Sequence, residues 1–146
     1  MRHQRLAKKF GRSTSHRKAL MSSLVTNLIL QSSIKTTLPK AKQARKDAEK
    51  IVTVARKGLA HEKPERALAA RRLAASRLQS PKAVQMLFDS VAPAMKDRPG
   101  GYTRIYKLGQ RSSDGAEMCL LQWVVLPSKA EAAPADAEAA PAAAEG

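Results

Sequence analysis

Basic side chains crowd the first eighteen residues, which hold seven Lys or Arg, two His and no Asp or Glu. Asp47 is the first acid of the chain, and twelve Lys or Arg precede it. Cationic side chains in such a block bind phosphate by charge, and basic N-terminal blocks are typical of nucleic-acid arms. A solvated basic tail is the alternative that the pattern leaves open. The chemistry indicated by this end of the sequence is therefore phosphate binding.

Catalytic chemistry has much weaker support. His3 and His16 lie among cations, which disfavour a proton on either ring, and no carboxylate is near them in the sequence to orient an imidazole. A nuclease that uses one of them as a base is the enzymatic alternative. No glycine-rich nucleotide loop and no metal-ligand spacing occurs. We read His61 as solvated and Cys119 as a small buried hydrophobe, and we predict no enzyme, metal or cofactor.

A helix is predicted directly after the basic block. Ser13, Thr14 and Ser15 offer oxygens for its N-cap, and an apolar stripe then runs to about Gln31. The stripe consists of Leu20, Leu24 and Leu28 beside Met21, Val25 and Ile29. Cations at a helix N-terminus oppose the helix dipole, yet Arg12, His16, Arg17 and Lys18 gather there. A phosphate bound at this helix end would reverse that effect, so the placement indicates an anion site.

A second candidate site is the segment Gly100-Gly-Tyr-Thr-Arg-Ile-Tyr106. Strand alternation would place Tyr102, Arg104 and Tyr106 on one side, and the two glycines would let a backbone approach closely. Such a group can stack on unpaired bases and bind phosphate. The alternative is that both tyrosines pack under the helices and Arg104 is only their polar edge.

The elements that must position these groups can be read from apolar spacing. Alternation and β-branching predict strands over residues 33–38, 102–108 and 117–126, the last two joined by a hairpin with an Asp114-Gly115 step. Three further helices are predicted: 39–58 with a small Ala-rich face and Gly58 as its stop, 64–78, and 81–93. Cys119, Leu121, Trp123 and Val125 are expected to face the core.

Length and composition favour one small domain with appendages. The chain has 146 residues and a net charge of +15, and residues 129–146 are Ala-rich with four acids and one Lys. We therefore predict a basic arm at 1–12, one domain at 13–128 and a disordered acidic Ala/Pro-rich tail at 129–146. No apolar run is long enough for a membrane span. An Arg-rich start also describes a mitochondrial transit peptide, but the first helix runs into a strand without a break.

Four motifs together resemble a known family. They are Met1-Arg-His, Gly11-Arg-Ser-Thr-Ser-His-Arg-Lys-Ala-Leu20, Ile34-Lys-Thr-Thr-Leu-Pro-Lys-Ala-Lys42 and Gly100-Gly-Tyr-Thr-Arg-Ile105. In this order the chain resembles the bacterial large-subunit ribosomal protein family L17 over residues 1–126. The resemblance implies a two-layer α+β domain of order α-β-α-α-α-β-β. It also implies a structural, non-catalytic role on large-subunit ribosomal RNA near the outer end of the peptide exit tunnel, in the cytoplasm. The tail departs from the resemblance.

The expected partners are therefore large-subunit ribosomal RNA and neighbouring large-subunit proteins, with no membrane and no small-molecule substrate. A DNA-binding or nucleoid protein is the competing class, which the lack of a zipper and of an evident recognition helix weakens. The acidic tail has a second possible role, transient shielding of the basic body before assembly. The residues expected to bind RNA are Arg2, His3, Arg5, Lys8, Lys9, Arg12, Ser15, His16, Arg17, Lys18, Lys35, Lys40, Lys42, Arg71, Arg72, Gly100, Gly101, Tyr102 and Arg104.

Overall fold

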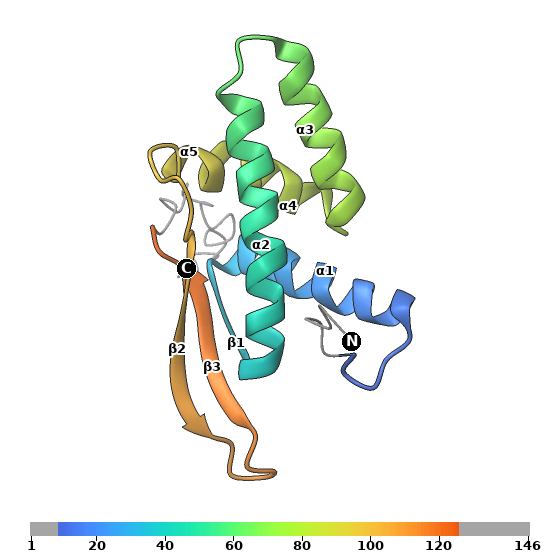
Figure 1. Cartoon of the computed structure of the whole chain (residues 1–146), viewed down its shortest axis with the longest axis vertical. Coiled ribbons are helices and arrows are strands. Elements are labelled where there is room, and N and C mark those ends of the chain that lie inside the picture. The colour runs from blue at the N-terminus through green and yellow to red at the C-terminus, as the bar shows by residue number, and fades with distance from the viewer. Residues whose placement is uncertain (1–8, 126–146) are drawn as a thin grey trace, which may run out of the picture.

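Helices and a three-stranded antiparallel sheet make up residues 9–125, the part of the chain that the computed structural model describes (Figure 1). Along the chain the elements are α1 (Thr14–Gln31), β1 (Ser33–Thr37), α2 (Leu38–Leu59), α3 (Pro64–Arg77), α4 (Pro81–Met86), η1 (Leu87–Val91), α5 (Ala92–Ala94), β2 (Thr103–Gln110) and β3 (Glu117–Trp123). The predicted α+β class is confirmed. The predicted arm is described only from Lys9, and the predicted tail lies outside the described residues.

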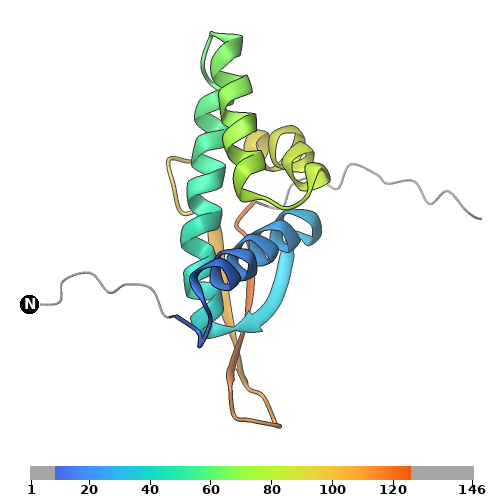
Figure 2. The ribbon, with the colours of Figure 1, turned by 90° about the vertical axis from the view of Figure 1, so that its right-hand side faces the viewer.

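The sheet has the order β1-β3-β2, so the last strand of the chain is the central one. Thr36 pairs with Cys119 on one side of β3, and Ile105 pairs with Leu121 on the other. Figure 2 shows α1 and α2 on the near side of this sheet, and both helices contact its strands. Helices and sheet thus form two layers, with the core between them.

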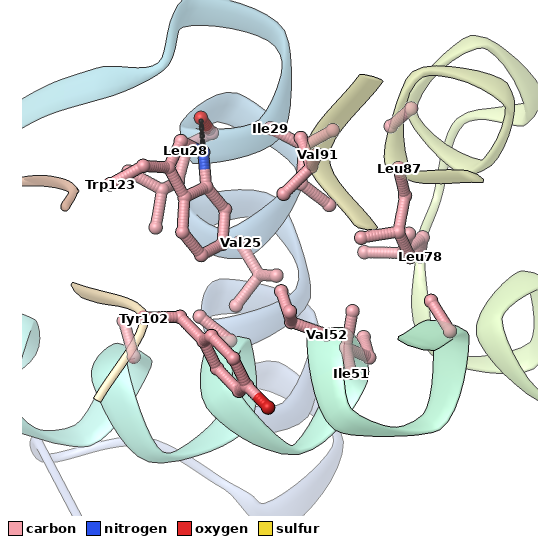
Figure 3. Close-up of a cluster of buried hydrophobic side chains, with 14 of the residues drawn as sticks. Val25, Leu28, Ile29, Ile51, Val52, Leu78, Leu87, Val91, Tyr102 and Trp123 are labelled. Atoms are coloured by element: carbon pink, nitrogen blue, oxygen red, sulfur yellow. Dashed lines mark hydrogen bonds between the residues drawn. The ribbon is translucent and has the colours of Figure 1, made fainter. Parts of the chain in front are cut away.

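The inner face of β3 supplies the centre of that core. Cys119, Leu121 and Trp123 have no exposed surface, as the alternation predicts. The indole Nε1–H of Trp123 donates a 3.1 Å hydrogen bond to the backbone carbonyl of Leu28, which ties the sheet to α1 (Figure 3). Val125 is 38% exposed, so its predicted core position is wrong. It follows the end of β3 at Trp123, where the alternation of the strand no longer applies.

The small face of α2 is buried as expected, and it lets α3 approach closely. Ala41, Ala44, Ala48 and Ala55 are fully buried along it. Gly58 does not act as the predicted helix stop, because α2 continues to Leu59 and ends at Ala60 in a right-handed conformation. A Cβ added at Gly58 would overlap the Cβ of Ala70 on α3. This glycine is therefore needed for helix packing rather than for termination.

The single helix predicted over 81–93 is instead three consecutive segments. A regular turn over Pro81–Met86 gives way to the wider π turn η1, in which the amide of Ala92 donates to the carbonyl of Leu87. Pro93 follows at once and has no amide hydrogen, so the ordinary α pattern cannot continue through it. Leu87, Phe88 and Val91 are nevertheless buried, as helical spacing predicts.

Candidate nucleic-acid interface

The start of α1 carries the side chains that the sequence marks as anion-binding. Ser13 is the N-cap, and its hydroxyl accepts a 3.4 Å hydrogen bond from the amide of His16. Ser15, also offered as a cap, is exposed inside the helix. No acid lies in the first turn of α1. As predicted, the charged side chains in the first turn of α1, at the positive end of its dipole, are all cationic.

The residues just before α1 make a turn that is anchored on the body. Phe10 and Gly11 both have positive φ, at 57° and 62°, and the Arg12 guanidinium donates a 3.0 Å hydrogen bond to the carbonyl of Phe10. The Phe10 ring is partly buried against the core. Phe10 and Lys42 line the same groove beside the start of α2. The turn thus brings the end of the basic arm next to the cations of α2.

A second groove, called here the α1 groove, lies between the start of α1, the middle of α2 and the end of α3. Its volume is about 520 Å³, and its lining includes Arg17, Lys18, Met21, Asp47, Arg77 and Leu78. The Ser22 hydroxyl donates a 2.6 Å hydrogen bond to the carbonyl of Arg77, which fixes the last turn of α3 beside α1. Arg77 was not among the predicted site residues, because only the packing of α3 brings it to Arg17.

Asp47 is the one acid among the residues lining the α1 groove. It is half-buried, and burial raises the pKa of its carboxyl, against the opposing charges of Lys50, Arg77 and Lys46. The raised pKa shows that loss of water outweighs those cations. A carboxylate in this position weakens an otherwise positive groove.

The remaining predicted cations do not form one cluster with α1. Lys35 is exposed on β1, and Lys40 and Lys42 lie on the first turns of α2. Arg71 lies over the ring of Phe88 at 4.8 Å and forms a 3.9 Å ion pair with Asp89, so this guanidinium links α3 to η1. Arg72 is exposed on the same helix.

The glycine-tyrosine segment lies far from the start of α1. Figure 1 places the loop before β2 on the side of the molecule opposite the first turn of α1. Tyr102 is only 1% exposed and packs against α2 (Figure 3), so its ring is a core group and the expectation that it faces RNA is corrected. Tyr102 precedes β2, which begins at Thr103, so strand alternation does not apply to it. Gly100 and Gly101 are exposed, and Gly101 has a φ of 65°.

Arg104 and Tyr106 remain together on the outer side of the sheet. The Arg104 guanidinium donates to the Tyr106 hydroxyl at 2.9 Å and to the Val124 carbonyl at 2.7 Å. Arg2, His3, Arg5 and Lys8 lie outside the described residues, whereas Lys9 is exposed. Of the predicted cations, the structure therefore places Arg17 and Lys18 in the α1 groove. Arg12 and His16 lie beside them at the start of α1, whereas Lys35 and Arg104 lie on the strands of the sheet.

Within residues 9–125 we also examined the residues that could form a metal site, a nucleophilic cysteine or a membrane span. In that span no group of three His, Cys, Asp or Glu is arranged to hold a metal ion. Cys119 is buried, its thiol is 3.4 Å from the Thr36 carbonyl, and burial raises its pKa. A thiol of this kind is a poor nucleophile. Among the helices of the same span, none is long and apolar enough to cross a membrane.

Comparison with known proteins identifies the family. A family profile described as "Ribosomal protein L17" matches residues 20–124. The chain is 50% identical over 123 residues to the large ribosomal subunit protein bL17 of Methylacidiphilum infernorum (isolate V4), with 84% of this chain and 88% of that protein covered.

Two further relatives carry the same name. The bL17 protein of Myxococcus xanthus (strain DK1622) is 46% identical over 130 residues, covering 89% of this chain and 88% of that protein. The bL17 protein of Thermomicrobium roseum is 44% identical over 124 residues, covering 85% of this chain and 99% of that protein. These matches confirm the resemblance seen in the four motifs and the expectation of a ribosomal protein rather than an enzyme. The chain belongs to the ribosomal protein L17 family.

Proposed function

We propose that this chain is a structural component of the large subunit of the bacterial ribosome, in the cytoplasm, and that it binds ribosomal RNA through the start of α1 and the α1 groove. The names of its relatives support the assignment to the large subunit. The net charge of +15 supports a polyanion as partner. A position near the outer end of the peptide exit tunnel, beside other large-subunit proteins, rests on the family resemblance.

The observation that carries the RNA proposal is the electrostatics of the start of α1. The free amides of the first turn form the positive end of the dipole of α1, and Arg12, His16 and Lys18 lie at the same end. The first turn contains no acid. This arrangement costs free energy in the isolated protein. A phosphate at the helix end would accept from the free amides and would also neutralise the cations, so binding converts an unfavourable arrangement into a favourable one.

The α1 groove extends this anion site toward α3. Arg17 and Arg77 line opposite parts of it, one from α1 and one from α3, so phosphates of a folded RNA strand can be contacted on both sides. Lys42 adds a cation at the groove that Phe10 lines beside the start of α2, and the exposed Lys9 directly precedes Phe10 in the chain. We retain the remaining predicted contacts, namely Arg2, His3, Arg5, Lys8, Ser15, Lys35, Lys40, Arg71, Arg72, Gly100, Gly101 and Arg104, as proposals, and we withdraw Tyr102.

The salt dependence of RNA binding tests this function. If about six to ten phosphates are neutralised, affinity for large-subunit ribosomal RNA should fall roughly 10³- to 10⁵-fold between about 50 and 200 mM salt. A flat response would contradict the proposal. Competition with duplex DNA of equal length tests the other class of nucleic acid, and absence of the chain from purified large subunits would refute the ribosomal role outright.

The arm should contribute to assembly rather than to folding. Replacing Arg2, Arg5, Lys8 and Lys9 with Ala removes four positive charges and no apolar side chain. We expect lower incorporation into the large subunit and an unchanged melting temperature. A variant that melts much lower than the parent would show that the arm belongs to the folded body instead.

A further inference from the structure

The face of the sheet opposite the helices carries a cluster that the α1 groove does not include. Cross-strand partners and every second residue of a strand share a face. The register therefore places Lys35, Leu120 and Tyr106 in one row and Ser33, Gln122 and Arg104 in the next. We call these six residues the open sheet face. In the described part of the chain, the helices pack on the other side (Figure 2).

Burial along the strands agrees with this assignment. On β3 the inward residues Cys119 and Leu121 are fully buried, whereas their neighbours Leu120 and Gln122 are half-buried. Lys35 is exposed on the edge strand β1, and Tyr106 is 45% exposed on the edge strand β2. Exposing part of an aromatic ring of this size to water costs free energy.

Tyr106 is held in a fixed orientation by Arg104. The guanidinium donates to the tyrosine hydroxyl at 2.9 Å and lies 5.9 Å from the ring centroid. Its second amino group donates to the Val124 carbonyl at 2.7 Å, which anchors the arginine to the end of β3. The ring is thus preorganised beside a cation and need not lose much side-chain freedom on binding.

The charge of the open sheet face selects the chemistry of the partner. Its two charged groups, Lys35 and Arg104, are both cationic, and no acid belongs to it. Leu120 gives an apolar floor between them, and the Gln122 amide can donate and accept. A partner must therefore be anionic and present flat apolar groups. Unpaired nucleotides have both properties, since each joins a phosphate to a base with an open π face.

We propose that the open sheet face binds an unpaired stretch of RNA, with one base stacked on Tyr106 and the adjoining phosphates at Lys35 and Arg104. This inference rests on the proposed function and adds to it a second surface of different chemistry. The α1 groove binds phosphates through charge and does not distinguish one RNA phosphate from another. The open sheet face requires a base that is free of its duplex, because a paired base offers no free face to the ring.

Substitution of Tyr106 in the full chain tests the proposal. The probes are a fluorescent single-stranded uridine oligonucleotide of about ten nucleotides and an RNA duplex of equal length, at one salt concentration. Tyr106→Leu should weaken binding of the single strand roughly 5- to 150-fold, the range expected for loss of one stacked base, and should leave duplex binding unchanged. Tyr106→Phe keeps the ring and should bind the single strand within about threefold of the parent.

Two further measurements separate the outcomes. Leu73→Ala removes an exposed apolar side chain on α3 and should change neither affinity, and melting curves report whether each variant folds. Equal losses for single strand and duplex, or no loss for either, overturn the inference. If Tyr106→Leu binds both probes normally but is depleted from assembled large subunits, the face contacts a protein, which also overturns it. Loss of salt-dependent RNA binding in the parent itself would instead refute the proposed function.

Discussion

The α1 groove and the open sheet face use arginine in opposite ways. Within residues 9–125, the guanidiniums of Arg17 and Arg77 make no hydrogen bond to the protein, and they line a groove whose shape comes from three helices. Arg104 makes two hydrogen bonds and holds an aromatic ring. An uncommitted cation can adjust to any phosphate, whereas a tethered one fixes a geometry. The difference predicts affinity from the first region and selectivity for unpaired bases from the second.

The α1 groove and the open sheet face depend on the same hydrophobic core, so a core substitution should disrupt both. Trp123 connects them, because its ring fills the space under the sheet and its Nε1–H bonds the α1 backbone at Leu28. Trp123→Ala should lower the free energy of unfolding by about 3–5 kcal/mol, measured by chemical denaturation. RNA binding of both kinds should then fall in proportion to the unfolded fraction. A variant that unfolds at the parental denaturant concentration would show that the two layers are not coupled through this residue.

Removing the cations of the α1 groove should affect one region only. In an Arg17→Ala, Lys18→Ala, Arg77→Ala variant, the slope of log affinity against log salt should decrease by about 2 to 3, because three phosphate contacts are lost. The Tyr106-dependent preference for single strands should persist.

A matched control removes the same charge elsewhere. Lys57, Lys63 and Arg66 are exposed near the connection between the end of α2 and the start of α3. Figure 1 shows this connection at the end of the two helices that lies away from α1. Replacement of the three residues by Ala should leave most of the salt slope intact. Equal effects of the two triple variants would mean that net charge, rather than the groove, determines binding.

The close packing of α3 on α2 at Gly58 positions Arg77 in the α1 groove. Gly58→Ala inserts a methyl group against Ala70, so we expect a loss of about 1–3 kcal/mol and a displaced α3. Because α3 carries Arg77, phosphate binding should weaken while single-strand selectivity is kept. Adding Ala70→Gly restores space, so the double variant should be more stable than the sum of the single effects predicts. Gly100→Ala, where a Cβ would meet nothing, serves as the control in thermal melts.

Asp47→Asn should produce the smallest effect, and in the opposite direction. Burial raises the pKa of Asp47, so the folded state retains this proton to higher pH than the unfolded chain does. Stability from this group is therefore present at low pH and is lost as pH rises through the folded-state pKa. The Asn variant should melt slightly higher at neutral pH and lose that pH dependence. RNA affinity should rise by less than about tenfold, since one partly screened charge contributes on the order of 1 kcal/mol or less.

Local chemistry made much of the fold predictable. The caps offered by Ser13, Thr14 and Ser15 placed the start of α1 within two residues, and the apolar stripe placed its end near Gln31. Pro64 and Pro81 marked the first residues of α3 and α4. The helical and strand periods correctly assigned most of the core, including Ala48 and Leu121. Two predictions of the direction in which a side chain faces failed because a strand ended near the residue. Tyr102 and Val125 lie just outside β2 and β3, and the alternation that placed them does not extend that far.

The sequence by itself determined which chemistry this protein carries. Residue types and their spacing established the excess of cations, their position at a helix N-terminus and the family, because charge and helical period are local properties of the chain. Only the tertiary structure decided which groups act together. Arg77 joins Arg17 because α3 packs along α2 until its last turn reaches α1. Arg104 shares a sheet face with Lys35 because β3, the last strand, inserts between β1 and β2. These side chains come together through packing between residues that are far apart in the sequence. A local sequence pattern does not encode such long-range contacts.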